Sequence, residues 1–224
     1  MRTTVYTGLC CLFLTACSSV AVIFPPEGTD DGIPSRILLP VPFSPQAPAG
    51  DWGAPYQEAC EEAALIMTDR FFKDGETAII PAEEMDAAIL DLVQWETAHG
   101  YGEDVTITEL AAIARDYYDY EAEIIDDVTT ERLRELVAGG HPVIVPAAGR
   151  ALRNPYFSGE GPFYHMLVIR GFDRRNFITN DPGTRRGAKY KYAFDVLLGT
   201  IHDWTGVKEE IERGEKRALV LTLP

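Results

Sequence analysis

A cysteine, a histidine and an aspartate occur in an order that suits nucleophilic acyl transfer: Cys60, His165 and Asp181. A thiol attacks a carbonyl carbon only as the thiolate, and the pKa of a free cysteine is about 8.5. A neighbouring imidazole can take the thiol proton and later deliver it to the leaving amine. A carboxylate on the other ring nitrogen fixes the tautomer and orientation of that imidazole. The three residues therefore predict a catalytic triad for acyl transfer through an acyl-thioester.

Cys60 is expected in the first turn of a helix. Apolar residues recur at helical spacing between Gln57 and Lys73, and Pro55 lies just before them, where a missing N–H costs little. The N-terminus of a helix favours a negative charge and therefore the thiolate. Three acidic neighbours oppose this effect, and we expect their carboxylates to point away from the thiol: Glu58, Glu61 and Glu62.

Two strands of a hairpin are expected to position the other two residues. The segments Tyr164–Phe172 and Asn176–Asp181 are rich in apolar and β-branched residues, and a short turn joins them. Neighbouring strands lie about 5 Å apart in the hydrogen-bonding direction. His165 and Asp181 are therefore expected to meet across the hairpin. The polar loop before this hairpin, residues 154–161, is expected to flank a substrate cleft.

The remaining elements follow an order of helices first and strands later. Hydrophobic periodicity predicts helices over residues 81–98, 106–118, 130–138 and 192–204, and strands over residues 121–125, 141–146 and 218–223. Thr106 and Glu109 have the spacing of a capping box at the start of their helix. This order predicts an α+β fold, with N-terminal helices packed on a C-terminal antiparallel sheet.

Several short motifs also resemble a known family when they are read together. They are Val41-Pro42-Phe43 with Gln46, Glu58-Ala59-Cys60-Glu61-Glu62-Ala63, Gly140-His141-Pro142-Val143-Ile144-Val145, His165-Met166-Leu167-Val168-Ile169-Arg170-Gly171-Phe172-Asp173 and Asn180-Asp181-Pro182-Gly183. Their order and spacing resemble the cysteine-peptidase family 39-like domains, relatives of the double-glycine leader peptidases of bacteriocin exporters. The resemblance spans residues 37–205 and implies a papain-like cysteine peptidase fold.

The resemblance implies a role for each matched residue. Cys60 matches the nucleophile, His165 the base and Asp181 the orienting acid. Gln46 matches the glutamine of a Val-Pro-x-x-x-Gln motif, which helps the cysteine amide to form the oxyanion hole. Gln57 is a competing donor, because it lies about one helical turn before the cysteine. The sequence leaves the choice between the two glutamines open.

The first residues are typical of an exported lipoprotein. Arg2 precedes a short apolar run that ends in Leu14-Thr15-Ala16-Cys17 and is too short to span a bilayer comfortably. This ending resembles the lipobox of bacterial lipoproteins, which implies cleavage before Cys17 and a diacylglycerol thioether on it. We expect a lipoprotein signal peptide over residues 1–16, a flexible tether over 17–36 and a peptidase family 39-like domain over 37–224. The expected location is the extracytoplasmic face of a membrane in the cell envelope.

Cysteine usage and charge narrow the function further. With Cys10 and Cys11 in the signal peptide and Cys17 lipidated, Cys60 is left without a disulfide partner. The formal charge of −15 argues against a nucleic-acid partner, because neutralising phosphates requires clustered Lys and Arg. No His-x-His, His-Glu-x-x-His or paired-cysteine spacing is present, so we expect no metal or cofactor. The expected partners are a peptide or protein substrate and the membrane.

Two alternatives to a peptidase remain open at this point. A transglutaminase or an amidase would use the same residues for acyl transfer. A protein of another class, a non-catalytic peptide-binding lipoprotein on a degenerate peptidase scaffold, would share the fold without the reaction. Glu61 is the residue that raises this second alternative, because many members of the family that the sequence resembles have glycine directly after the cysteine.

Overall fold

The computed structural model describes residues 32–74 and 78–224. The predicted signal peptide, the predicted lipidation site Cys17 and most of the predicted tether lie outside the described residues. Ile33 is buried and belongs to the hydrophobic core, so the packed domain includes residues before position 37, where the sequence placed its start. Within the described ranges, no helix is both long enough and apolar enough to cross a membrane.

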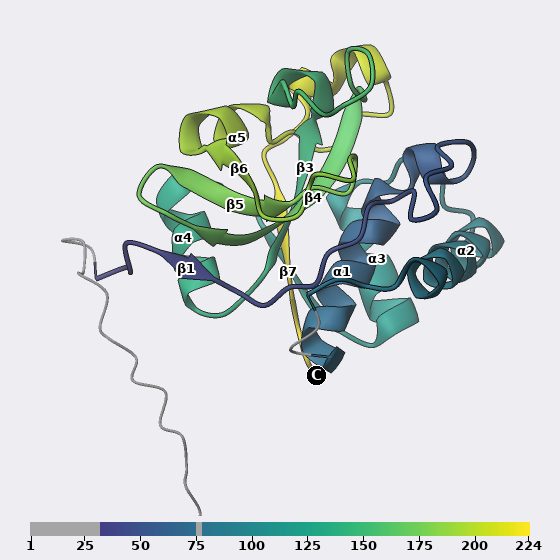
Figure 1. Cartoon of the computed structure of the whole chain (residues 1–224), viewed down its shortest axis with the longest axis horizontal. Coiled ribbons are helices and arrows are strands. Elements are labelled where there is room, and N and C mark those ends of the chain that lie inside the picture. The colour runs from purple at the N-terminus through teal and green to yellow at the C-terminus, as the bar shows by residue number, and fades with distance from the viewer. Residues whose placement is uncertain (1–31, 75–77) are drawn as a thin grey trace, which may run out of the picture.

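An antiparallel sheet forms the centre of the domain (Figure 1). Its strands are β1 (Ile37–Leu38), β2 (Glu121–Ile125), β3 (Val143–Ala148), β4 (Tyr164–Phe172), β5 (Asn176–Asn180), β6 (Tyr190–Ala193) and β7 (Ala218–Thr222). The strand order is β2-β7-β3-β4-β5-β6, and β1 pairs with the C-terminal end of β4. Every residue of β3 and β4 is buried, because other elements cover both faces of these central strands.

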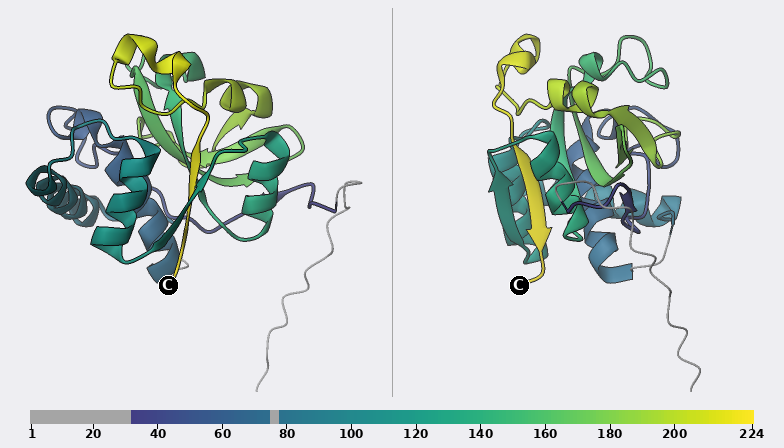
Figure 2. Two further views of the ribbon diagram at one scale, coloured as in Figure 1. Left: turned by 180° about the vertical axis from the view of Figure 1, so that it is seen from behind. Right: turned by 90° about the vertical axis from the view of Figure 1, so that its left-hand side faces the viewer.

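The helices gather mainly on one side of the strands, as Figures 1 and 2 show for α1–α3. They are α1 (Cys60–Asp74), α2 (Ala82–His99), α3 (Ile107–Tyr118), α4 (Thr130–Ala138) and α5 (Phe194–Thr200), with 3-10 turns η1 (Tyr56–Glu58), η2 (Gly149–Leu152) and η3 (Lys208–Arg213). Helix α1 packs against β4, α2 packs against α1, and α3 packs against β2. The predicted α+β class, with helices packed on an antiparallel sheet, is confirmed, but β1 precedes all the helices and was not predicted.

Helix α1 is buried on every side over residues 60–69. Small residues such as Ala63 and Ala64 let neighbouring elements approach its backbone closely. The hydrophobic periodicity predicts one apolar face for this helix. The neighbours of α1 instead cover its polar positions as well, including Glu61 and Glu62.

Local sequence signals account for the start of α3. The Thr106 hydroxyl accepts a hydrogen bond from the backbone N–H of Glu109 at 3.2 Å. The carboxylate of Glu109 accepts one from the backbone N–H of Thr106 at 2.8 Å. These reciprocal bonds satisfy two donors that the first turn of a helix leaves free, so the predicted capping box is confirmed.

The predicted helix over residues 192–204 is wrong at both ends. Tyr192 belongs to β6 and pairs with Phe177 of β5, and α5 extends only from Phe194 to Thr200. Residues 190–193 carry two tyrosines in alternate positions, which suits a strand at the edge of a sheet. In this strand, the Tyr192 hydroxyl contacts Asp181.

Candidate active site

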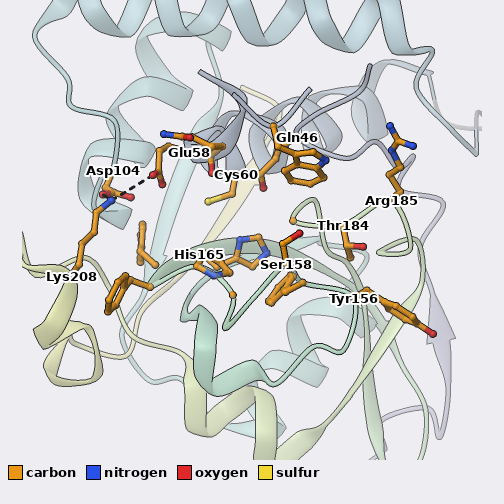
Figure 3. Close-up of a pocket in the computed structure, with 18 of the residues that line it drawn as sticks. Gln46, Glu58, Cys60, Asp104, Tyr156, Ser158, His165, Thr184, Arg185 and Lys208 are labelled. Carbon is orange, nitrogen blue, oxygen red and sulfur yellow. Dashed lines mark hydrogen bonds and ion pairs between the residues drawn. The ribbon is translucent and has the colours of Figure 1, made fainter. Parts of the chain in front are cut away.

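A cavity of about 600 Å³ opens where the N-terminal end of α1 faces the N-terminal end of β4. Cys60 and His165 both line this cavity and face each other across it (Figure 3). Loop residues 156–158 and 161–163 and turn residues 183–186 complete much of the wall. The structure thus brings together two residues that are far apart in the sequence, and it places the predicted flanking loop at the cavity.

Strands β4 and β5 hold His165 against Asp181. The Nε2 atom of His165 lies 2.7 Å from Oδ1 of Asp181, and both side chains are buried. Because Nε2 faces the carboxylate, Nδ1 is the ring nitrogen that remains for a proton transfer elsewhere. Gly183 makes room for this arrangement, since a Cβ at that position would lie 2.8 Å from Cε1 of His165. Its backbone N–H also donates to Oδ1 of Asp181 at 3.0 Å.

Two further side chains complete the surroundings of Asp181. The Tyr192 hydroxyl donates to Oδ2 of Asp181 at 2.6 Å, and the Asn154 amide donates to the same oxygen at 2.9 Å. Burial alone raises the pKa of Asp181, but the charge and hydrogen bond of His165, with the bonds from Tyr192 and Asn154, lower this pKa below its ordinary value. Asp181 is therefore an ionised partner for His165 at neutral pH.

The Cys60 thiol points to a neighbouring carboxylate on the same helix. Its Sγ donates to Oε2 of Glu61 at 2.9 Å, and the backbone N–H of Val105 donates to Oε1 of Glu61 at 3.3 Å. The expectation that Glu61 points away from Cys60 is wrong. Burial of α1 on all sides explains the difference, because Glu61 is 1 % exposed and has no solvent to turn to.

The surroundings of Cys60 favour its protonated form. Burial is the largest influence that raises the pKa of the Cys60 thiol, followed by the charge and hydrogen bond of Glu61 and the charge of Glu62. A backbone hydrogen bond with Met166, the residue after His165, acts in the opposite direction and lowers this pKa. The net pKa lies well above the ordinary value, so the thiol is neutral in this arrangement.

A pair of buried carboxyl groups lies behind the first turn of α1. Glu62 of α1 and Glu96 of α2 share a hydrogen bond, and they are 5 % and 4 % exposed. Burial raises the pKa of Glu62 to about 7, and burial with the charge of Glu62 raises the pKa of Glu96 to about 10. The pair therefore retains a proton at neutral pH. In the described part of the chain, no three side chains of the metal-ligating types are grouped to hold an ion.

The two candidate glutamines differ in how their amides are engaged. Nε2 of Gln46 donates to the backbone carbonyls of Tyr56 and Gln57 at 2.9 and 3.0 Å. These bonds tie Gln46 to the turn η1, which leads directly into Cys60. Gln57 also lines the cavity, and its side chain is exposed. Gln46 is thus the rigid member of the pair, and both of its amide hydrogens are in use.

Comparisons with known proteins identify the family and the fold. The fold and the cavity define an α+β protein of the papain-like type, with a cysteine at the start of the central helix. The sequence matches the Peptidase_C39 like family over residues 38–210, and the chain belongs to this family. A crystal structure of a provisionally assigned C39-like peptidase from Bacillus anthracis has a similar fold, with a TM-score of 0.55 and 16 % identity. The match covers 84 % of this chain and 98 % of the other. No curated protein matches the sequence significantly.

Proposed function

We propose that this protein is a cysteine peptidase in which Cys60 attacks the peptide carbonyl, His165 moves the proton and Asp181 orients His165. One observation carries the proposal: His165, bonded through Nε2 to a buried carboxylate, faces a thiol at the start of a helix across a common cavity. Family membership supports the same chemistry.

The proposed reaction has two steps with a shared covalent intermediate. His165 takes the Cys60 proton, the thiolate bonds to the carbonyl carbon, and the C–N bond breaks as His165 protonates the leaving amine. His165 then removes a proton from a water molecule, whose oxygen attacks the acyl-thioester. The C–S bond breaks, the product leaves as a carboxylic acid, and His165 returns its proton to the Cys60 sulfur.

An oxyanion on the substrate carbonyl oxygen needs hydrogen-bond donors in the first step. The backbone N–H of Cys60 and the amide of Gln46 are the proposed donors. Gln46 can exchange one of its two neutral carbonyl partners for the oxyanion, because hydrogen bonds to a charged acceptor are about twice as strong. That exchange becomes favourable only when charge develops, which is the requirement for stabilising a transition state.

The thiol must leave Glu61 before it can react in this way. Rotation of the Cys60 side chain would move Sγ from Oε2 of Glu61 toward His165. The same contact favours a second candidate function, a peptide-binding protein without hydrolysis, because a thiol held by a carboxylate and raised in pKa is a poor nucleophile.

A thiol-directed activity probe separates the two functions. If the site is catalytic, a peptidyl acyloxymethyl ketone labels Cys60 in the folded protein and fails to label the His165→Ala variant. Purified Cys60→Ser protein then retains its fold and loses peptide hydrolysis, because a hydroxyl is far less ionised than a thiol. Hydrolysis by the Cys60→Ser protein at the rate of the parent would exclude Cys60 as the nucleophile.

We also propose that Cys17 carries a lipid that holds the protein on the outer side of a membrane. The support is the Leu14-Thr15-Ala16-Cys17 motif. Metabolic labelling with a radioactive fatty acid is expected to depend on Cys17 and to be retained in a Cys11→Ala control. Unchanged labelling and membrane fractionation of Cys17→Ala protein would reject the anchor.

A further inference from the structure

The two ends of the catalytic cavity carry opposite charge. Figure 3 shows Glu58, Asp104 and Lys208 at one end and Arg185 at the other, with Cys60 and His165 between them. Lys208 lies 3.5 Å from a carboxylate oxygen of Glu58 and 3.7 Å from one of Asp104, so this end carries one excess negative charge.

The opposite end holds two neighbouring arginines, Arg185 and Arg186, both of which line the cavity. Neither forms an ion pair with a carboxylate of the described residues, although the chain has 35 acidic and 20 basic residues. The guanidinium of Arg186 lies over the ring of Tyr156, 4.9 Å from its centroid. This stacking holds the guanidinium by its face and leaves its N–H groups free at the edges.

The side chain of Arg185 contacts the loop around Gly50. Its guanidinium lies directly against Gly50, where a Cβ would overlap it. Two large aromatic side chains that line the cavity remain accessible: Trp52 is 40 % exposed and Tyr156 is 44 % exposed. Exposed aromatics beside arginines offer both an apolar surface and charged donors to a ligand.

We infer that the Arg185–Arg186 end of the cavity binds a carboxylate group of the substrate peptide. A guanidinium presents its N–H groups in a planar fork that matches the two oxygens of a carboxylate. The excess negative charge of Glu58 and Asp104 repels the same group from the opposite end, which fixes the direction in which an acidic peptide lies. The inference rests on the proposed peptidase function for the identity of the ligand as a substrate.

The carboxylate has two sources, an acidic side chain or the C-terminus of the peptide, and matched probes separate them. Octapeptides of alanine and serine carry one Glu at each position in turn, with both chain ends blocked. A second set has Gln in place of Glu, and a third has neither residue and a free C-terminal carboxylate. Binding is measured by calorimetry with the Cys60→Ser protein, which is expected to bind peptides without hydrolysing them.

We expect a Glu peptide of one register, or the free-acid peptide, to bind at least about tenfold more tightly than its neutral counterpart. The Arg185→Gln/Arg186→Gln variant is expected to lose this preference and to retain the affinity for neutral peptides. Arg175→Gln, which removes an exposed arginine outside the cavity, is the matched control and is expected to keep the preference. Preference for the free-acid peptide alone identifies the chain end as the ligand, and preference for a Glu peptide identifies a side chain.

Equal affinity of charged and neutral peptides in every register would overturn the inference. So would a preference that survives in the double arginine variant. Hydrolysis of the preferred peptide by the parent protein is then measured separately. A binding preference without cleavage would contradict the peptidase function and leave the carboxylate site in place, so the two proposals fail in different ways.

Discussion

The two walls of the cavity differ in how their charged groups are satisfied. On the sheet wall, both oxygens of Asp181 have hydrogen-bond donors, and its pKa lies below the ordinary value. On the helix wall, Cys60, Glu61 and Glu62 are crowded together in a buried helix, and the pKa values of all three are raised. The sheet wall is therefore organised in advance to orient an imidazole, whereas the helix wall holds the Cys60 thiol in its neutral form.

The largest expected effect comes from removing the charge of the sheet wall. Asp181→Asn should lower the turnover of peptide hydrolysis by about four orders of magnitude, because a neutral amide neither fixes the tautomer of His165 nor stabilises its cation. Tyr192→Phe is the matched control, since it removes one bond to Asp181 and keeps the carboxylate. Steady-state kinetics measure the loss of turnover, and the pH profile of Cys60 alkylation measures the loss of stabilisation of the His165 cation. Identical profiles and turnover in Asp181→Asn and the parent would remove Asp181 from the site.

A smaller effect is expected from the glutamine that supports the helix wall. Gln46→Ala should lower kcat by about a hundredfold, because it removes an oxyanion donor and loosens the turn before Cys60. Gln57→Ala, at an exposed position on the same cavity, should change kcat by less than about tenfold. Thermal unfolding of both variants separates loss of catalysis from loss of structure. The reverse order of effects on kcat would assign the donor role to Gln57.

The reactivity of the thiol tests the contrast between the walls directly. Glu61→Gln removes the side chain whose charge and hydrogen bond raise the pKa of Cys60, so the thiolate fraction at pH 7 should increase. Alkylation by iodoacetamide is expected to become about tenfold faster, which corresponds to a pKa lower by about one unit. Glu58→Gln, a half-exposed acid of the same region, is the control. Equal alkylation rates in Glu61→Gln and the parent would mean that Glu61 does not restrain the thiol.

The smallest expected effect concerns stability and comes from the Glu62–Glu96 pair. Their folded pKa values, about 7 and about 10, exceed the value of about 4.3 for an unfolded Glu, so the folded state holds more protons. The free energy of unfolding should therefore fall as pH rises from about 5 to 9. Glu61 and Asp104 also face this pair and add to the repulsion.

Glu96→Gln should make this decline in stability shallower, because it removes the group with the highest pKa of the pair. Unfolding temperatures measured between pH 5 and pH 9 provide the comparison. Glu83→Gln removes an exposed carboxylate from the same helix and should leave the slope unchanged. If both variants show the slope of the parent, the pair is not the source of the pH dependence.

Most elements could be predicted because their signals are local. The capping residues of α3 and the apolar runs of β3 and β4 act within a few neighbouring positions. The meeting of His165 and Asp181 also followed from a short hairpin. Tyr192 and Asn154 could not be assigned as partners of Asp181, because their contacts depend on long-range packing. For Tyr192, the sequence pattern also predicts a helix instead of the observed strand. The burial of Glu61 is likewise a property of the whole domain, since α1 alone would expose it.

The N-terminal strand determines which way the cavity faces relative to the entry of the chain. β1 pairs with Gly171 and Phe172 at one end of β4, and Arg170 donates twice to the carbonyl of Leu39. His165 lies near the other end of β4, about 20 Å away at the rise of an extended strand. Under the proposed lipid anchoring, the anchored segment would join the domain at the end of β4 opposite His165. A peptide substrate could therefore reach the mouth of the cavity without passing the point where the anchored segment joins the domain.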